Sequence, residues 1–563
     1  MTNDQPQFQT RCISSLVKVF ADEPLSAPSW SKGTALWSET YAFQVAYRTE
    51  QSLHPLRVFA SSELEPWMSV RAVGLSPSEL PTYAHSDNKV LRQTPGLYPD
   101  LLQPLGQEGL RGYPGQWRAV WVTVELPTRA EWEAASGHGS VKDVRPFSID
   151  VWFEDGEGTK LGGEQFVLDV LPAELPEQRL IHTEWTHYDC LASYYGVEVF
   201  SERHWELIER YASAAVRHGM NMLLTPIFTP PLDTAIGGER LTVQLVDVET
   251  AGDGNYTFGF DKLGRWVEMC NRIGIQYFEF SHLFTQWGAK HAPKIVAKVS
   301  EGGEKRIFGW ETDATGEAYE KFLGQFLPEL VAFIREHGLE ARSYFHVSDE
   351  PSLEQLDAYR SASAILKKHL GDFPFFEALS DYNFYEQGLV PVPIPANDHI
   401  DKFLENGVSP LWTYYCCGQS VEVSNRFFNM PSARNRIIGY QLYKFRIQGF
   451  LHWGYNFWNT QHSVSALDPY RVTDAGGAFA SGDAFVVYPG EEGPLDSIRW
   501  EVFREALQDL RACELLESRI GREQVVELLD AGLETPLTFR NYPRDADWLL
   551  SKRQEINERI ANS

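Results

Sequence analysis

The spacing of hydrophobic and polar positions changes character near residue 172. Before that point, short segments rich in β-forming residues, such as 41–47 and 117–124, are separated by glycine, proline and acidic turns. Such segments are typical of strands, and no convincing long helix interrupts the series. We therefore expect an antiparallel β-sandwich in this part of the chain.

After residue 172, helical stripes alternate with short apolar runs. Trp205, Ile208, Tyr211 and Ala215 share one helical face within 202–218, and a strand-like run follows. Helices are expected at 202–218, 265–273, 319–337 and 434–448, and strands at 180–189, 221–226, 275–280, 341–350, 375–379, 411–415 and 450–453, with a weak strand at 391–395. The alternation predicts an α/β fold, a (β/α)8 TIM-like barrel preceded by the N-terminal sandwich, with a doubly wound open sheet as the alternative.

The chain is long enough for more than one hydrophobic core. It has 563 residues, and the segment 172–179, with two prolines and several charges, is predicted to be a linker. We expect a β-sandwich domain over 1–175, a barrel domain over 176–520 and a helical extension over 521–563. The connections 230–255 and 287–312 exceed the usual length of about 2 to 6 residues, and we expect them to wall a pocket.

One stretch, 341–351, combines a strand pattern with two adjacent carboxylates. Asp349 and Glu350 are followed by Pro351, and Ser352 to Gln355 form a capping box that opens a helix. Side chains at the carboxyl ends of barrel strands commonly carry the chemistry, so the pair is a catalytic candidate. The alternative is that both acids only complement the helix dipole.

The same stretch carries a resemblance to a known family. His346-Val-Ser-Asp-Glu-Pro351 resembles the signature of glycoside hydrolase family 123, the β-N-acetylgalactosaminidases and their relatives. Pieces elsewhere are similar to that family in the same order: Gly96 to Asp100, Trp287 to Lys290, Trp453 to Trp458, and Ser497 to Glu501. The resemblance therefore spans most of the chain.

The resemblance implies a retaining exo-glycosidase that releases terminal β-linked N-acetylgalactosamine. Adjacent residues of a strand point to opposite faces, so only a bend lets Asp349 and Glu350 address one substrate. They also fit poorly as two acids facing each other across a glycosidic bond. The resemblance implies instead that the acetamido oxygen of the sugar attacks the anomeric carbon. Asp349 then holds the amide N–H, and Glu350 is the general acid and base.

Other side chains near strand ends are candidates for sugar binding. Tyr414 and Tyr415 end one strand, and one of them is expected to support the acetamido oxygen; which one is open. The tryptophans of 453–458 suit stacking on a sugar ring, with core packing as the alternative. The full set of substrate-binding candidates is His182, Trp185, His187, Asp189, His282, Trp287, His346, Tyr414, Tyr415, Trp453, Tyr455, Asn456 and Trp458.

The composition of the chain favours some classes of binding partner over others. Aromatic residues make up 13% of the chain, which suits a sugar cleft, and the formal net charge of −27 argues against nucleic acid and anionic membranes. We expect a neutral glycan substrate, no cofactor and no metal; a homodimer is left open. The six cysteines lack CxxC spacing, so reduced thiols are expected.

The start of the sequence lacks the pattern of a signal peptide, and no apolar run has transmembrane length, so a cytoplasmic protein is expected. Two other functions remain as alternatives: another β-N-acetylhexosaminidase or glycosidase of the same fold, and a non-catalytic sugar-binding barrel. The intact pair of Asp349 and Glu350 favours an enzyme.

Overall fold

The computed structural model describes residues 7–137, 142–299 and 302–563, which form two compact units. The first, here the terminal unit, comprises Met1–Gln178, Ser420–Lys444 and Leu495–Ser563; the second, the central unit, comprises Arg179–Gln419 and Phe445–Pro494. Each unit thus combines segments distant in sequence. The domain boundaries expected at 175 and 520 remain a prediction.

Two five-stranded sheets form the N-terminal part of the terminal unit. One has the order β1-β3-β8-β5-β6 and the other β2-β10-β9-β4-β7. Their bounds are β1 (Phe8–Ser14), β2 (Lys32–Trp37), β3 (Thr40–Thr49), β4 (Leu53–Ser61), β5 (Met68–Ser78), β6 (Gly96–Pro104), β7 (Leu110–Gly112), β8 (Trp117–Glu125), β9 (Arg145–Glu154) and β10 (Lys160–Glu174). The expected N-terminal sheets are therefore present.

The two sheets share one hydrophobic core. Phe43 of β3 stacks on Phe166 of β10 with ring centroids 4.2 Å apart, and inward-facing side chains of both sheets form a single cluster. One expectation is wrong here. Strands β2 and β10 run parallel, so the pairing is not wholly antiparallel. Gly96 to Asp100, one of the pieces similar to the family, begins β6, which pairs with β5.

Helices complete the terminal unit. They are α1 (Arg129–Ser136), η1 (Glu65–Trp67), α9 (Ser432–Arg436), α10 (Ile438–Lys444), α11 (Ile498–Ile520), α12 (Arg522–Asp530) and α13 (Ala546–Asn562). The stretch expected to be a helical extension, 521–563, contains α12 and α13. The helix expected at 434–448 ends at Lys444 and is divided between α9 and α10.

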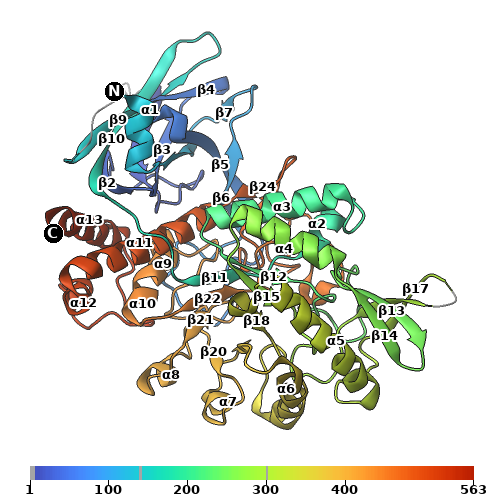
Figure 1. Cartoon of the computed structure of the whole chain (residues 1–563). Coiled ribbons are helices and arrows are strands. Elements are labelled where there is room, and N and C mark those ends of the chain that lie inside the picture. The colour runs from blue at the N-terminus through green and yellow to red at the C-terminus, as the bar shows by residue number, and fades with distance from the viewer. Residues whose placement is uncertain (1–6, 138–141, 300–301) are drawn as a thin grey trace. The chain divides into compact units, whose positions relative to one another are not determined.

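Short parallel strands form the centre of the central unit, with helices α3 to α6 outside them (Figure 1). The strands are β11 (Ile181–Glu184), β12 (Met222–Thr225), β15 (Tyr277–Phe280), β18 (Ser343–Phe345), β19 (Phe376–Ala378), β20 (Val392–Ile394), β21 (Trp412–Tyr414) and β22 (Gly449–His452). They pair in the orders β11-β22-β21, β12-β15-β18 and β19-β20. Interior side chains such as Leu224, Phe376 and Leu451 form one apolar cluster.

The helices of the central unit largely follow the sequence pattern. They are α2 (Tyr188–Tyr195), α3 (Glu202–Arg217), α4 (Asp261–Ile273), α5 (Glu317–Glu336), α6 (Leu356–Leu370), α7 (Tyr382–Glu386) and α8 (Asp401–Glu405), with 3-10 turns η2 (Glu340–Arg342), η3 (Leu353–Gln355) and η4 (Gln461–Ser463). The capping box of Ser352 and Gln355 is present at η3.

Two strands are shorter than expected. β18 ends at Phe345, so His346 to Glu350 are loop. The backbone N–H groups of Val347 and Ser348 donate to the Glu377 side chain instead of to a neighbouring strand's backbone. β11 ends at Glu184, and Tyr188 already begins α2.

The two long connections of the central unit are not simple loops. They contain β13 (Asp247–Gly252), β14 (Asn255–Gly259), β16 (Ile295–Val299) and β17 (Glu304–Phe308), which form a sheet of order β14-β13-β16-β17. Two further short strands are β23 (Val487–Pro489) and β24 (Pro494–Asp496). Within the described residues, no helix is long and apolar enough to span a membrane.

Candidate active site

A cavity of about 210 Å³ lies in the central unit. It is smaller than pockets for drug-sized ligands, which usually span about 300 to 1,000 Å³. Its lining mixes aromatic rings with a few acids and amides, the composition that suits one sugar unit. The lining residues are Trp185, Leu232, Asp233, Gln286, Trp287, Asp349, Glu350, Ala378, Tyr414, Cys416, Cys417, Leu451, Trp453, Gln461, His462 and Phe479.

Asp349 and Glu350 reach the same cavity because the backbone turns between them. Glu350 has φ +45°, a left-handed conformation that side-chain-bearing residues rarely adopt. The turn is held on both sides, since Trp287 N donates to Asp349 O and Glu350 N donates to Ala378 O, each at 3.0 Å. Two adjacent carboxylates can address one substrate only if the backbone bends in this way. Strained backbone of this kind is frequent at functional sites.

The two carboxylates have different partners. Gln286 Nε2 donates to Asp349 Oδ2 at 2.6 Å, and Tyr414 donates its hydroxyl to Glu350 Oε1 at 2.6 Å. Asp349 is buried, with 5% of its surface exposed, whereas Glu350 is open to the cavity. Tyr414 therefore contacts the acid pair, and which tyrosine supports the acetamido oxygen stays a prediction.

Burial affects the protonation of both acids. It raises the pKa of Asp349 well above its usual range, as does the charge of Glu350, while the Gln286 bond opposes the shift. The Glu350 side chain is exposed to solvent at the cavity, but the protein around it still removes much of its solvation, which raises its pKa. The hydrogen bond from Tyr414 acts in the opposite direction and lowers that pKa. Two close carboxylates in such a place favour a state in which the pair holds one proton.

Among the cavity residues that were not sequence candidates, Gln286, Asp233 and His462 form a hydrogen-bonded chain that reaches the acid pair. Gln286 connects two parts of the site, because its Oε1 accepts from Asp233 N while its amide donates to Asp349. His462 N donates to Asp233 Oδ2 at 3.0 Å. Asp233 is a third carboxylate, and burial raises its pKa. The only sequence signals were that Asp233 follows a strand within a long connection and that Gln286 precedes Trp287.

A buried charged network lies behind the acid pair. His346 donates from Nε2 to Glu279 Oε1 at 2.7 Å and from Nδ1 to Glu377 Oε1 at 3.2 Å. Burial alone would lower the pKa of His346, but these bonds raise it to about 9. Glu377 Oε2 also accepts the backbone N–H groups of Val347 and Ser348, at 3.1 and 3.0 Å. The network thereby fixes the loop that leads into Asp349.

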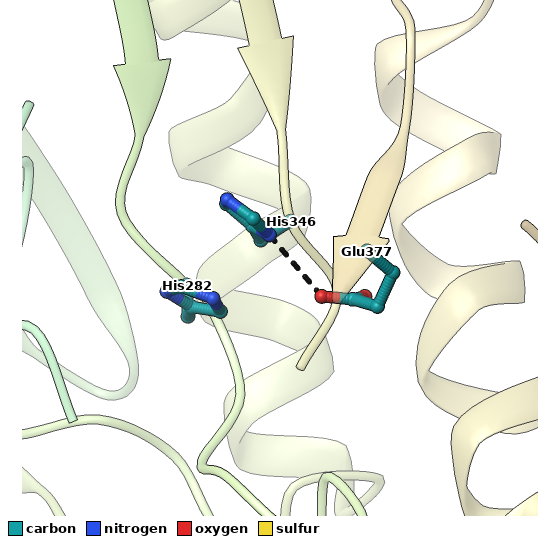
Figure 2. Close-up of side chains that lie close together, drawn as sticks. All are labelled: His282, His346 and Glu377. Atoms are coloured by element: carbon teal, nitrogen blue, oxygen red, sulfur yellow. Dashed lines mark hydrogen bonds and ion pairs between the residues drawn. The ribbon is translucent and has the colours of Figure 1, made fainter. Parts of the chain in front are cut away.

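His282 lies against this network (Figure 2). Its ring stacks on that of His346 with centroids 4.0 Å apart and 21° between the planes. Neither ring nitrogen has a hydrogen-bond partner within the described part of the chain, and burial lowers the pKa of His282 well below its usual value. A neutral imidazole therefore packs on a charged one.

The same residues are the metal-ligand candidates of the central unit. One ligand atom each of His282, His346 and Glu377 lies within 4.8 Å of the others. Ring nitrogens bind a metal along directions in the ring plane, and in two stacked, nearly parallel rings these directions do not converge. His346 is also protonated between two carboxylates. A metal would thus require His346 to lose its proton and one ring to turn.

His187 and Asp189, expected near sugar hydroxyls, lie outside the cavity lining and anchor a loop. Arg240 donates to Asp189 Oδ2 and Oδ1 at 2.8 and 2.6 Å, and its Nη2 lies 3.0 Å from His187 Nδ1. Burial lowers the pKa of His187 to about 3, and the charge of Arg240 acts in the same sense. Arg240 also donates to Leu232 O at 2.9 Å. Through Arg240, His187 and Asp189 thus hold the connection that carries the cavity residues Leu232 and Asp233.

The remaining sequence candidates divide between cavity and core. Asp349, Glu350, Trp185, Trp287, Tyr414 and Trp453 line the cavity. Those outside its lining are buried: His182 bonds Glu184, Tyr455 donates to Tyr211 O, Asn456 bonds the backbone of His187, Trp458 donates to Val487 O, and Tyr415 packs against Phe450. The contacts of this second group are those of side chains packed in the core, which was the alternative to sugar binding.

Comparison with known proteins relates the chain to a family of glycoside hydrolases. The sequence model described as Glycoside hydrolase 123, catalytic domain, matches residues 185–516. A family 123 glycoside hydrolase from Clostridium perfringens, whose structure was described in connection with glycolipid glycan hydrolysis, aligns with a TM-score of 0.73 and 14% identity, covering 99% of this chain and 98% of that one. At that identity the likeness concerns the fold.

Other comparisons add little. A family 5 mannosidase from Rhizomucor miehei, an E301A mutant, aligns at 11% identity over 62% of this chain and 94% of its own, with a TM-score of 0.31 that is too low to support an argument. The search of curated proteins gave no match.

Proposed function

The chain belongs to glycoside hydrolase family 123, and from that premise we propose that it is a retaining exo-β-N-acetylgalactosaminidase that uses substrate assistance. The observation that carries the proposal is the divergent bonding of two adjacent acids at one cavity. Gln286 donates to Asp349, and Tyr414 donates to Glu350. Two acids with different partners suit two different tasks better than one shared task.

In the proposed first step the sugar supplies its own nucleophile. The acetamido oxygen bonds to the anomeric carbon as the glycosidic bond breaks, and the leaving oxygen takes a proton from Glu350. Asp349 accepts the amide N–H, which makes the acetamido oxygen more nucleophilic and stabilises the positive oxazoline that forms. In the second step Glu350 removes a proton from water, which opens the oxazoline and restores the original anomeric configuration.

The proposed division requires one proton on the pair, with Glu350 protonated and Asp349 ionised. Burial raises the pKa of both groups, which disfavours two charges and favours a total of one proton. The Gln286 amide and the Tyr414 hydroxyl each stabilise the ionised form of the acid that they bind, so the placement of the proton on Glu350 is part of the proposal. The preceding loop, fixed by Glu377, keeps both carboxylates in place.

Aromatic rings are proposed to hold the sugar. Trp185, Trp287 and Trp453 line the cavity, and stacking on an apolar sugar face is their usual contribution. Trp185 and Trp453 are fixed by their own bonds, to Glu279 Oε1 at 2.6 Å and Asp483 Oδ2 at 2.9 Å. Trp287 is 37% exposed and would cover the sugar from the rim.

A conventional two-carboxylate mechanism is the second candidate, and Asp233 favours it. This acid lines the same cavity as Glu350 and could serve as a protein nucleophile or as the base for an inverting reaction. Substrates without an acetamido group separate the two mechanisms, because substrate assistance depends on that group whereas attack by Asp233 does not.

A panel of p-nitrophenyl glycosides tests the proposal. Hydrolysis of the β-N-acetylgalactosaminide in preference to the β-galactoside supports it. Preference for the β-N-acetylglucosaminide would keep the mechanism but change the sugar. Turnover of none of the panel would favour a non-catalytic sugar-binding protein.

We also propose the finer features of the fold. The parallel strands are proposed to close into a (β/α)8 barrel: single parallel bridges at Phe345–Phe375 and Ala396–Tyr414 link neighbouring sheets, and Asn221 N donates to His182 O between β11 and β12 at 3.1 Å. We further propose domain boundaries at 175 and 520, a cytoplasmic location and a glycan substrate. A homodimer is left open.

A further inference from the structure

Two consecutive cysteines form part of the cavity wall. Cys416 and Cys417 follow β21 and enter a turn closed by Gln419 N, which donates to Cys416 O at 3.1 Å. Gln419 Oε1 accepts from Cys416 N at 2.9 Å and from its thiol at 3.3 Å. The turn matters because consecutive side chains of an extended strand would point in opposite directions. Here both cysteines line the cavity that holds Glu350.

The two sulfurs lie close together and within reach of solvent. The Cys416 thiol is hydrogen-bonded to Cys417, a contact that raises the pKa of Cys416, and both side chains are partly exposed. The other cysteines of the chain, Cys12, Cys190, Cys270 and Cys513, are buried. A thiol reagent that enters the cavity therefore meets a pair of thiols at one place only.

We propose that Cys416 and Cys417 form a dithiol site that captures trivalent arsenicals and that an arsenical bound there blocks the sugar cavity. The chemistry is an exchange without oxidation. An arsenical R–As=O and two thiols give R–As(S-Cys)₂ and water: two As–S bonds form, and the two thiol protons leave with the oxygen. Arsenic stays trivalent throughout.

Geometry favours an arsenic bridge over a direct disulfide. Neighbouring Cα atoms across a trans peptide are about 3.8 Å apart, below the roughly 4.4 to 6.8 Å that disulfides usually need. An arsenic atom between the two sulfurs lengthens the bridge by one atom and relieves that constraint. The two thiols are therefore better placed to form a ring through an arsenic atom than to form a disulfide with each other.

Blockade follows from the neighbours of the pair. Cys416 lies two residues beyond the end of β21 at Tyr414, whose hydroxyl bonds Glu350. An aryl group on arsenic would thus occupy space beside the proposed general acid, and sugar and arsenical should compete.

Intact-protein mass spectrometry with phenylarsine oxide tests the site. The wild-type chain should gain one phenylarsenic group less two hydrogens, while Cys416→Ser and Cys417→Ser should each lose this adduct. Cys12→Ala, a buried thiol of the terminal unit, is the matched control and should keep it. The adduct should be removed by 2,3-dimercaptopropanol and not by an equal concentration of a monothiol. Circular dichroism checks that each variant is folded.

Two outcomes would overturn the proposal: a wild-type chain that takes up no arsenical, or an adduct that persists in both serine variants. The mass readout also works on Glu350→Gln, so it is independent of turnover and of the proposed activity. In the wild type, activity on whichever glycoside of the panel is cleaved should fall in proportion to the labelled fraction. Full labelling with full activity would refute the blockade.

Discussion

Tyr414 donates its hydroxyl to Oε1 of Glu350 at 2.6 Å, and this bond joins the end of β21 to the turn after β18. The bond lowers the pKa of Glu350, against the rise that lost solvation causes. Tyr414 therefore lowers the pH at which the proposed general acid gives up its proton.

Replacing Tyr414 by phenylalanine should move the basic limb of the pH–rate profile to higher pH. Without the bond the pKa of Glu350 rises, so the acid stays protonated further into the alkaline range. We also expect a lower kcat at the optimum, because Glu350 loses its orienting partner. Tyr415→Phe is the control, since Tyr415 packs against Phe450 outside the cavity lining. A Tyr414→Phe profile that coincides with the wild type would contradict the role assigned to the bond.

Gln286→Met should shift the acidic limb of the pH–rate profile. The Gln286 amide bond lowers the pKa of Asp349, so its loss raises that pKa, and Asp349 must then be ionised at a higher pH than before. The acidic limb should move to higher pH while the basic limb stays in place. A shift of the basic limb alone would show that the roles of the two acids are exchanged. The measurement is kcat/KM against pH for an N-acetyl substrate.

Much of the central unit follows from local pattern, and the site follows only in part. Helix α5 follows its apolar spacing, since the residues that recur along that spacing, such as Phe322, Phe326 and Leu330, are its buried ones. Asp349 and Glu350 could be found because strand and capping signals surround them. Asp233 and Gln286 could not, since their importance arises from a contact between two connections more than 50 residues apart in sequence.

Side-chain direction explains the remaining differences. His187 and Asp189 were expected to face a sugar, but Arg240, about 50 residues later, binds both of them. In the same way, of Tyr414 and Tyr415 it is Tyr414 that contacts the acid pair. The sequence pattern does not distinguish the two, because both residues are aromatic and both are buried.

The terminal unit should lose stability as pH rises from about 5 to 8. Arg436 and Arg553 bind three buried carboxylates, Glu39, Glu505 and Asp509, so one carboxylate is in excess. Burial raises the pKa of Glu505 to about 7. The folded chain thus holds a proton that the unfolded chain releases near pH 4.5, and that contribution is lost as pH rises through about 7.

Glu505→Gln should therefore flatten this slope. Thermal melting at pH 5, 6, 7 and 8 should show a smaller fall in Tm for the variant than for the wild type. Glu523→Gln, an exposed position on α12, is the control and should retain the wild-type slope. Equal slopes for the wild type and Glu505→Gln would mean that another group takes the proton.

The central claim is that Asp349 and Glu350 perform different tasks, and leaving-group dependence tests it most directly. Rates of Glu350→Gln and Asp349→Asn are compared on N-acetyl substrates whose leaving groups range from activated phenols to poor ones. General acid catalysis is worth roughly 10²- to 10⁴-fold, so Glu350→Gln should lose the most on poor leaving groups and little on activated phenols. Asp349→Asn should lose a similar factor on every substrate, because oxazoline formation itself is impaired. Equal leaving-group sensitivity in the two variants, or robust hydrolysis of a plain β-galactoside that falls away in Asp233→Asn, would contradict substrate assistance.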